Sequence, residues 1–298
     1  MDKFRRIIYL SCIVCFTTIT CFGQVQRWND FELKAKPRSV VQVPYNVIIT
    51  NGKPVKGSRG TTTGADGDYR LNFDKQGILL NQATYSESGN ITEKVLFDMT
   101  PAGKIKAKKT YKYAFAFAEV LQLSLLLFDN NGCPVKADAY SFGPGATEKE
   151  ANAYKQSGKL TGSIQYECND NGKVTAEKYL LPNGTVKEMY RYTYNPQGLL
   201  LSRQSFEGDA TLVSTDKFQY DNKGRKIEEI SLNSDDTLLN KRTYTYNEQD
   251  STRETAAYNK KGEVYRVRRE KFNTHHHVVD NTLMNKPGNN VEETFSYQ

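Results

Sequence analysis

The chain has 298 residues, enough for one or two ordinary domains, and its net charge is +7. Hydrophobic residues make up only 38%, and there are 19 Tyr but a single Trp, which favours a thin β architecture over a thick α/β core. The basic residues are dispersed, and the densest run, 104–112, holds five Lys that divide between two faces at strand spacing. A nucleic-acid footprint would be a concentrated basic stripe, so we expect no nucleic-acid partner.

Residues 1–23 have the pattern of a secretory signal peptide. A basic start at Lys3, Arg5 and Arg6 precedes an apolar stretch over 7–21, which is too short and too early to span a membrane. We expect cleavage before Gln24; lipid attachment at Cys21 is the alternative. No later run reaches about 18 apolar residues, so we expect no membrane span. The expected location is the periplasm, the cell surface or the medium.

Residues 24–68 are predicted to form an N-terminal hairpin that caps the rest of the chain. The segment 39–50 is rich in Val, Ile and Tyr and indicates a strand. Asn51-Gly52 supplies the turn, and the return strand begins at Val55.

Residues 69–298 repeat one short motif, an aromatic residue followed by Asp or Asn and, three residues later, Gly. Its strongest copies are 26 residues apart: Tyr194 to Gly198, Tyr220 to Gly224, and Tyr246 to Asp250, where Gly is replaced. Weaker anchors follow 12 residues after each, at Phe206, Leu232 and Tyr258. The residues to which we assign the turns are Asp74, Gly77, Asp129, Gly132, Gly172, Gly198, Asp221, Gly224 and Gly262.

The motif predicts a turn between two strands. Asp or Asn caps backbone N–H groups with its own side chain, and Gly takes the left-handed φ that closes the turn. The next anchor comes eight residues after the Gly, and because eight is even we expect every anchor to return to one fixed face. The predicted fold is all-β: an extended, twisted antiparallel meander of stacked hairpins that forms an open sheet.

One segment interrupts the repeats. Residues 113–128 are nearly all apolar and are compatible with a buried strand or a helix. Thr147-Glu148-Lys149-Glu150 has the pattern of a capping box, so we expect a short helix within an insertion over 142–159. Cys133 and Cys168 remain after removal of the signal; export permits a disulfide, but two cysteines alone do not establish a pairing.

Pairs of aromatic residues two positions apart are the candidate binding residues. Besides Tyr111 and Tyr113, they are Tyr192, Tyr194, Phe218, Tyr220, Tyr244 and Tyr246. In register they would form an aromatic ladder on one face, which could bind sugar rings or a partner protein. The alternative is cross-strand packing that only holds the sheet together.

We find no catalytic constellation, cofactor motif or metal site in the sequence. The only histidines are His275, His276 and His277, and no cysteine or carboxylate cluster accompanies them apart from Asp280. The turn loops lack the dense alternating carboxylates of a calcium site. No nucleophile motif, zinc-protease motif or phosphate loop occurs. We therefore expect a non-enzymatic protein without a cofactor.

The repeated units resemble the YD repeats of Rhs-type proteins and the short secreted YD-like repeat proteins of Bacteroidetes. Leu33-Lys34, Ser39-Val40, Tyr45, Gly52 and Val55-Lys56-Gly57 are similar to the start of those short proteins, and the resemblance covers about 33–272. It implies a non-enzymatic β-repeat protein of the cell envelope or secretome. Rhs repeats enclose a toxin, but this chain lacks the long array, the boundary motif and the toxin domain, so that role is not carried over. MORN-like repeats are a neighbouring resemblance with shorter periods.

We accordingly expect a secreted or envelope module that binds an unidentified protein or glycan along its sheet face. A structural component that assembles through its sheet edges is the alternative. A glycan-active enzyme is a remote third, because it would need two carboxylates facing each other across a cleft.

Overall fold

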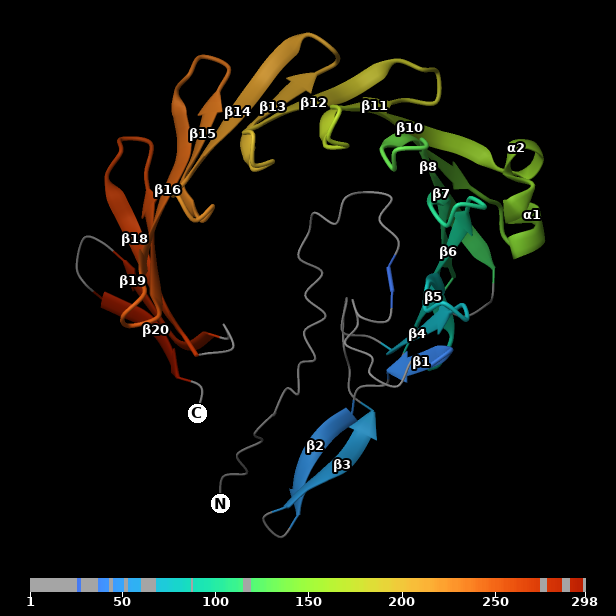
Figure 1. The fold of residues 1–298 in the computed structure, drawn as a ribbon, viewed down its shortest axis with the longest axis horizontal. Helices are drawn as coiled ribbons and strands as arrows, with labels where there is room; N and C mark the ends of the chain where they lie inside the picture. Colours follow the sequence, from blue (N-terminus) through green and yellow to red (C-terminus); the bar gives the residue numbers. More distant parts are fainter. Residues whose placement is uncertain are drawn as a thin grey trace. The chain divides into compact units, whose positions relative to one another are not determined.

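The computed structural model describes residues 26–27, 37–42, 45–50, 53–59, 68–86, 88–114, 119–273, 278–285 and 290–296. The chain divides into two compact units, 1–174 with 180–184, and 175–179 with 185–298. Among the described residues, regular structure consists of antiparallel strands and two short helices (Figure 1). This confirms the predicted all-β meander with one helical insertion. The predicted signal peptide, the Asn51-Gly52 turn and the three histidines lie outside the described residues.

The first unit is a meander of hairpins. Its strands are β1 (Ser39–Gln42), β2 (Tyr45–Thr50), β3 (Lys53–Arg59), β4 (Asp68–Phe73), β5 (Leu79–Tyr85), β6 (Ile91–Met99), β7 (Ile105–Tyr113), β8 (Val120–Phe128), β9 (Pro134–Ser141) and β10 (Lys159–Cys168). From β4 to β10 each strand pairs with the next, and β1 pairs with β4. β2 and β3 pair as a separate two-stranded sheet.

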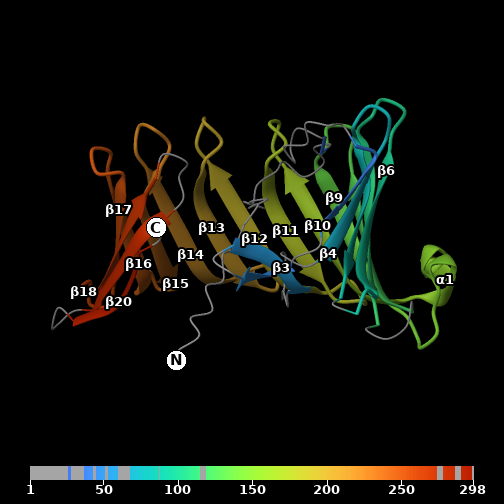
Figure 2. The same cartoon turned by 90° about the horizontal axis from the view of Figure 1, so that it is seen from below.

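The second unit continues the same pattern after β11 (Val174–Leu180). Its strands are β12 (Val186–Tyr194), β13 (Leu200–Glu207), β14 (Thr211–Tyr220), β15 (Lys226–Asn233), β16 (Leu238–Asn247), β17 (Thr252–Tyr258), β18 (Val264–Phe272), β19 (Val278–Asn285) and β20 (Asn290–Ser296). Each strand from β12 to β20 pairs with its chain neighbours. Figure 2 shows these strands side by side, with turns at two edges of the sheet.

Asp and Asn side chains close the turns. At Asp221, Oδ1 accepts from the backbone N–H of Lys223 at 3.0 Å and of Arg225 at 2.9 Å. Gly224 has φ 76°, which an L residue adopts only with strain. The same side-chain acceptor occurs at Asp74, Asp129, Asn169, Asn195, Asn233 and Asn259. Where glycine is absent, Asp236 (φ 58°) and Ser251 (φ 51°) take the left-handed conformation instead.

A β-bulge follows almost every turn and corrects one expectation. Gln219 lies opposite Glu228, but Tyr220 lies opposite Lys226, so Ile227 is an extra residue. The same skip leaves out Leu80, Lys106, Leu121, Val135, Leu201, Val213, Leu239 and Tyr265. An extra residue reverses the alternation of side chains. The expectation that all anchors share one face was therefore wrong: successive anchors alternate between the two faces.

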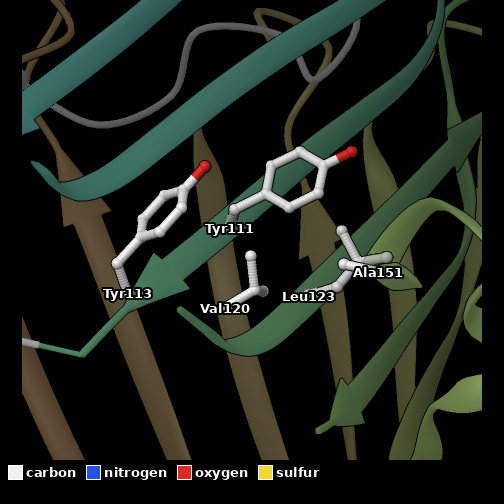
Figure 3. Close-up of a cluster of buried hydrophobic side chains, with 5 residues drawn as sticks. All are labelled: Tyr111, Tyr113, Val120, Leu123 and Ala151. Atoms are coloured by element: carbon white, nitrogen blue, oxygen red, sulfur yellow. The ribbon is translucent and has the colours of Figure 1, made fainter. Parts of the chain in front are cut away.

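The insertion packs on the first unit. α1 (Glu148–Asn152) begins with the predicted capping box at Thr147, and α2 (Tyr154–Ser157) follows it. Residues 120–128, left open between strand and helix, form β8. Ala151 of α1 is buried with Tyr111, Tyr113, Val120 and Leu123, the larger of the two core clusters among the described residues (Figure 3).

A disulfide joins Cys133 and Cys168, whose Cα atoms are 6.3 Å apart. Cys133 precedes β9 and Cys168 ends β10, and these two strands are neighbours. The sequence left this pairing open. The bond closes a loop with a sequence separation of 35 residues that contains the whole insertion.

Reducing this disulfide should destabilise the first unit. Loss of the loop constraint on the unfolded chain is worth ~4 kcal/mol for a loop of this length. Denaturant unfolding with and without reductant should show that loss. The Cys133→Ser/Cys168→Ser variant should have the lower stability in both conditions. A wild-type midpoint that reductant does not move would contradict the pairing.

Replacing Ser251 by Gly should stabilise the second unit by ~1 kcal/mol, because Gly adopts positive φ without the steric cost that Ser carries. Ser234→Gly is the matched control, since Ser234 is an exposed turn residue that lacks a positive φ. Thermal unfolding of both variants measures the difference. Equal shifts in the two variants would show that the left-handed conformation at 251 costs nothing.

Candidate interaction face

The second unit presents six aromatic side chains on one face. Tyr192 lies opposite Arg203, and Arg203 lies opposite Asp216. Phe218 lies two residues beyond Asp216 and opposite Glu229, which in turn faces Arg242. Side chains alternate along strands, so one face carries Tyr192, Tyr194, Phe218, Tyr220, Tyr244 and Tyr246. We call it the ladder face. Phe206, Leu232 and Tyr258 lie on the opposite face.

The tyrosines of the ladder have a structural role. The Tyr220 hydroxyl donates to the backbone carbonyl of Leu200 at 2.9 Å. The Tyr246 hydroxyl donates to the carbonyl of Lys226, also at 2.9 Å. Both acceptors lie 20 residues earlier, near the start of a preceding strand, so the ladder ties successive hairpins together. The packing interpretation is therefore correct for part of each side chain.

The rings also bind cations from the same sheet. The Lys226 ammonium lies 5.5 Å from the Phe218 ring centroid and 5.2 Å from that of Tyr244. The Arg225 guanidinium lies 4.3 Å from the centre of the Tyr246 ring. Contacts of this kind are cation–π interactions, worth about 0.5–1 kcal/mol at exposed sites. One side of these rings is thus already covered by a cation.

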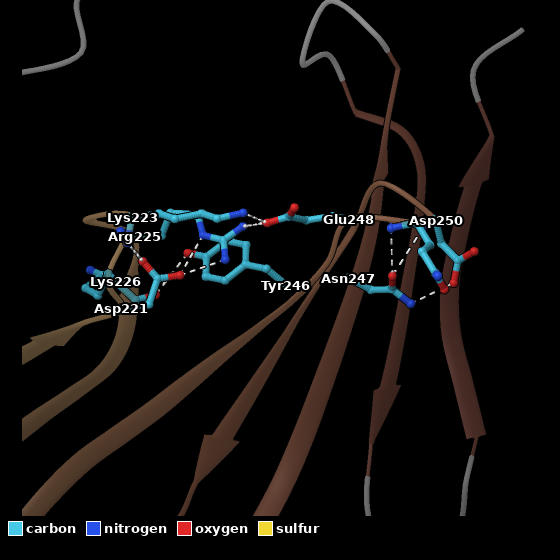
Figure 4. A network of polar contacts seen from close by, with 9 residues as sticks. Asp221, Lys223, Arg225, Lys226, Tyr246, Asn247, Glu248 and Asp250 are labelled. Carbon is cyan, nitrogen blue, oxygen red and sulfur yellow. Dashed lines mark hydrogen bonds and ion pairs between the residues drawn. The ribbon is translucent and has the colours of Figure 1, made fainter.

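A polar network connects two successive turns beside the ladder (Figure 4). Arg225 donates from Nε to Asp221 at 2.7 Å. The Glu248 carboxylate, in the next turn along this edge, accepts from Arg225 Nη1 at 3.1 Å and from Lys223. These groups are exposed, so each pair contributes little alone. Together they fix the spacing between neighbouring hairpins.

Ion pairs on the ladder face are better shielded. Arg203 donates to Asp216 at 2.7 Å, and the Ser231 hydroxyl donates to the same carboxylate at 2.6 Å. Asp216 is 9% exposed. Burial, together with the nearby Glu177 carboxylate, raises the pKa of Tyr192. The face is therefore a mosaic of half-buried rings and compensated charges.

Glu229 sits at the centre of this mosaic. Its carboxylate accepts from Lys226 at 2.7 Å and from the Tyr244 hydroxyl at 3.1 Å. Burial by itself would raise the pKa of Glu229, but these hydrogen bonds and the positive charge of Lys226 lower it. Burial opposes the charge of Lys226 as well, and the bond to Glu229 raises the pKa of that lysine. Both groups are thus held charged.

The Tyr111 and Tyr113 pair of the first unit has a different environment. Both rings are buried beneath α1, where the Tyr113 hydroxyl donates to Glu148 at 2.6 Å and the Tyr111 hydroxyl to Asn152 at 2.8 Å. Burial is the main cause that raises the pKa of Tyr111 to about 12. In contrast, the six rings of the ladder face are only half-buried. Among the described residues, α1 is the one element that packs over a sheet face.

The described residues contain no group of three or more His, Cys, Asp or Glu side chains placed to hold a metal ion. Neither described helix has the length and apolarity that crossing a membrane requires. A depression of about 210 Å³ lies on the insertion and is lined by Phe142, Gly143, Pro144, Gly145, Ala146, Glu150 and Ser157. Its single carboxylate, Glu150, already caps α1.

No protein-family model matches the chain, and no curated protein matches it. Among solved structures, a porin-like protein from Bacteroides uniformis is similar over 79% of this chain and 91% of its own, with 10% identity and a TM-score of 0.35. A protein of unknown function from Bacteroides fragilis is similar over 38% of this chain and 94% of its own, with 15% identity and a TM-score of 0.30.

A Tc holotoxin pore from Photorhabdus luminescens, which contains TccC3, is similar over 81% of this chain, with 12% identity and a TM-score of 0.27. This chain spans 15% of that protein's length. These likenesses are weak, and similarity at this level identifies no family for the chain.

The lowered pKa of Glu229 predicts a loss of stability in acid. The folded state binds this proton less readily than the unfolded state, so Glu229 stabilises the fold above the ordinary value of 4.5 and loses that effect as the pH falls below it. In Glu229→Gln, the loss of unfolding free energy between about pH 5 and pH 3 should be smaller than in wild type. Glu207→Gln, an exposed control, should follow wild type. Equal pH dependence in all three would contradict the network.

Proposed function

We propose that this chain is an exported, non-enzymatic β-repeat protein that binds a partner protein through the ladder face of its second unit. The observation that carries the proposal is the half-burial of the six aromatic side chains, which contrasts with the closed Tyr111 and Tyr113 pair. Purely structural rings would be expected to have the closed environment. The export expectation is supported by the sequence of residues 1–23.

A protein partner suits the chemistry of this face better than a glycan does. Sugars stack on open ring faces, but one side of the Phe218, Tyr244 and Tyr246 rings is covered by Lys226 or Arg225. Tyr and Arg are enriched at the centre of protein interfaces. The exposed ring edges, hydroxyls and guanidinium groups of the ladder face match that composition.

The repeat chemistry supports the proposed relationship to short YD-like repeat proteins. Asp74, Asp129 and Asp221 close their turns through the side chain, as expected of an aromatic-Asp-x-x-Gly unit. In this proposal the repeats are a scaffold, and the side chains on the ladder face provide recognition.

An assembly component of the envelope is the second candidate. The bulge residues Val213, Leu239 and Tyr265 are 49%, 41% and 41% exposed. They lie 26 residues apart, on β14, β16 and β18, and so repeat along one sheet. Exposed apolar side chains in a repeating row favour contact with another protein surface, including a second copy of this chain.

Tyr244→Leu should abolish partner capture, because it removes a ring and hydroxyl from the ladder face. Tyr258→Leu is the matched control: Tyr258 is also half-buried, its hydroxyl lies 3.2 Å from that of Thr243, and Lys241 lies 5.4 Å from its ring, but it is on the opposite face. Immobilised wild type and both variants would be incubated with an envelope extract, and captured proteins quantified by mass spectrometry.

A partner retained by wild type and Tyr258→Leu, and reduced at least tenfold by Tyr244→Leu, is the expected result. Equal capture by the two variants would contradict the ladder face as the binding surface. Tyr244-dependent binding on a glycan array would favour the glycan alternative. Capture of this chain itself, lost in Leu239→Glu, would favour the assembly role.

A further inference from the structure

We propose that three arginines on the ladder face, Arg242, Arg266 and Arg268, form a recognition site for an extended acidic segment of a partner protein. This inference rests on the proposed function, because it names the chemistry that the partner presents to the same face. The site lies on β16 and β18, with β17 between them.

The strand register brings these arginines together. Arg242 lies opposite Ala257, and Ala257 lies opposite Arg266. In the adjacent row, Tyr244 faces Thr255, and Thr255 faces Arg268. The three arginine side chains therefore surround two small residues, Ala257 and Thr255, that form the floor between them. All three arginines are exposed, whereas Ala257 is buried.

Charge on this part of the face is not balanced. Elsewhere on the ladder face each cation has its own carboxylate, as in Arg203 with Asp216, Lys226 with Glu229, and Arg253 with Glu270, all at 2.7 Å. Arg242 and Arg268 make no hydrogen bond or ion pair with another described residue. Arg242 lies opposite Glu229 and helps to lower its pKa, but that carboxylate is already bonded to Lys226.

The imbalance arises from the repeat itself. Equivalent cross-strand pairs recur every 26 residues: Arg203 with Asp216, then Glu229 with Arg242, then Thr255 with Arg268. The first two pairs contain one acid and one base. In the third, threonine stands where the acid was, and Arg268 is left without a counter-charge. A ligand that supplies carboxylates would restore the pattern of the earlier repeats.

Spacing favours an extended peptide. Arg266 and Arg268 are two residues apart on one strand, so their Cα atoms are ~6.7 Å apart, as are alternate residues of any extended chain. Arg242 is two strands away, ~10 Å across the sheet. Guanidinium groups bind carboxylates through two parallel hydrogen bonds. A segment with glutamate or aspartate at alternate positions can therefore meet the Arg266 and Arg268 pair, while Tyr244 and Arg242 contact its flank.

The test uses a fluorescein-labelled peptide of alternating glutamate and serine, with binding to the full chain measured by anisotropy. Arg242→Gln/Arg268→Gln should weaken binding roughly threefold to tenfold and reduce its salt dependence. Lys187→Gln/Lys217→Gln changes the net charge equally at exposed positions on the opposite face and should leave the affinity unchanged.

Three results would overturn the inference. They are equal weakening by both double variants, equal binding of a glutamine–serine peptide, and binding of a sulfated glycan fragment in preference to the acidic peptide. The capture experiment separates this inference from the proposed function. If Tyr244→Leu loses the captured partner but Arg242→Gln/Arg268→Gln retains it, the ladder face binds a partner without the arginine site. If only the arginine variant loses acidic-peptide binding, the site exists and the aromatic residues are not its partner surface.

Discussion

A side-chain oxygen of Asp or Asn, accepting two backbone N–H groups, is the interaction on which this structure depends. At Asp221 it bonds to the N–H groups of Lys223 and Arg225, and a left-handed residue then completes the turn. The turn ends one strand and starts the next within a few residues. Because it recurs along the chain, it produces hairpins of constant length, and constant length lets equivalent side chains stand in register.

The bulge after each turn determines what those side chains do. Without it, every anchor would share one face and compete for the same space. With one extra residue per hairpin, Tyr194, Tyr220 and Tyr246 lie on the ladder face, while Phe206, Leu232 and Tyr258 lie on the other. Each face therefore receives an anchor from every second strand. The spacing leaves room for cations such as Lys226 and Arg225 beside the rings.

Local chemistry could be predicted from the sequence, and features that depend on pairing could not. The turn residues and the Thr147 capping box involve groups a few residues apart, so their patterns are visible in the chain. The face of each anchor was predicted wrongly, because an even count of residues does not reveal Ile227 or Leu201 as unpaired extras. The disulfide and the convergence of Arg242 with Arg268 depend on strand register, which spacing alone does not give.

The register of β14 and β15 tests this account most directly, because the two-faced arrangement and the ladder face both follow from the bulge. Cross-strand backbone contacts measured by NMR on the isotope-labelled protein report it without substitutions. The account predicts contacts of Gln219 with Glu228 and then of Tyr220 with Lys226, with Ile227 skipped. A continuous register, in which Tyr220 faces Ile227, would place the anchors on one face and contradict it.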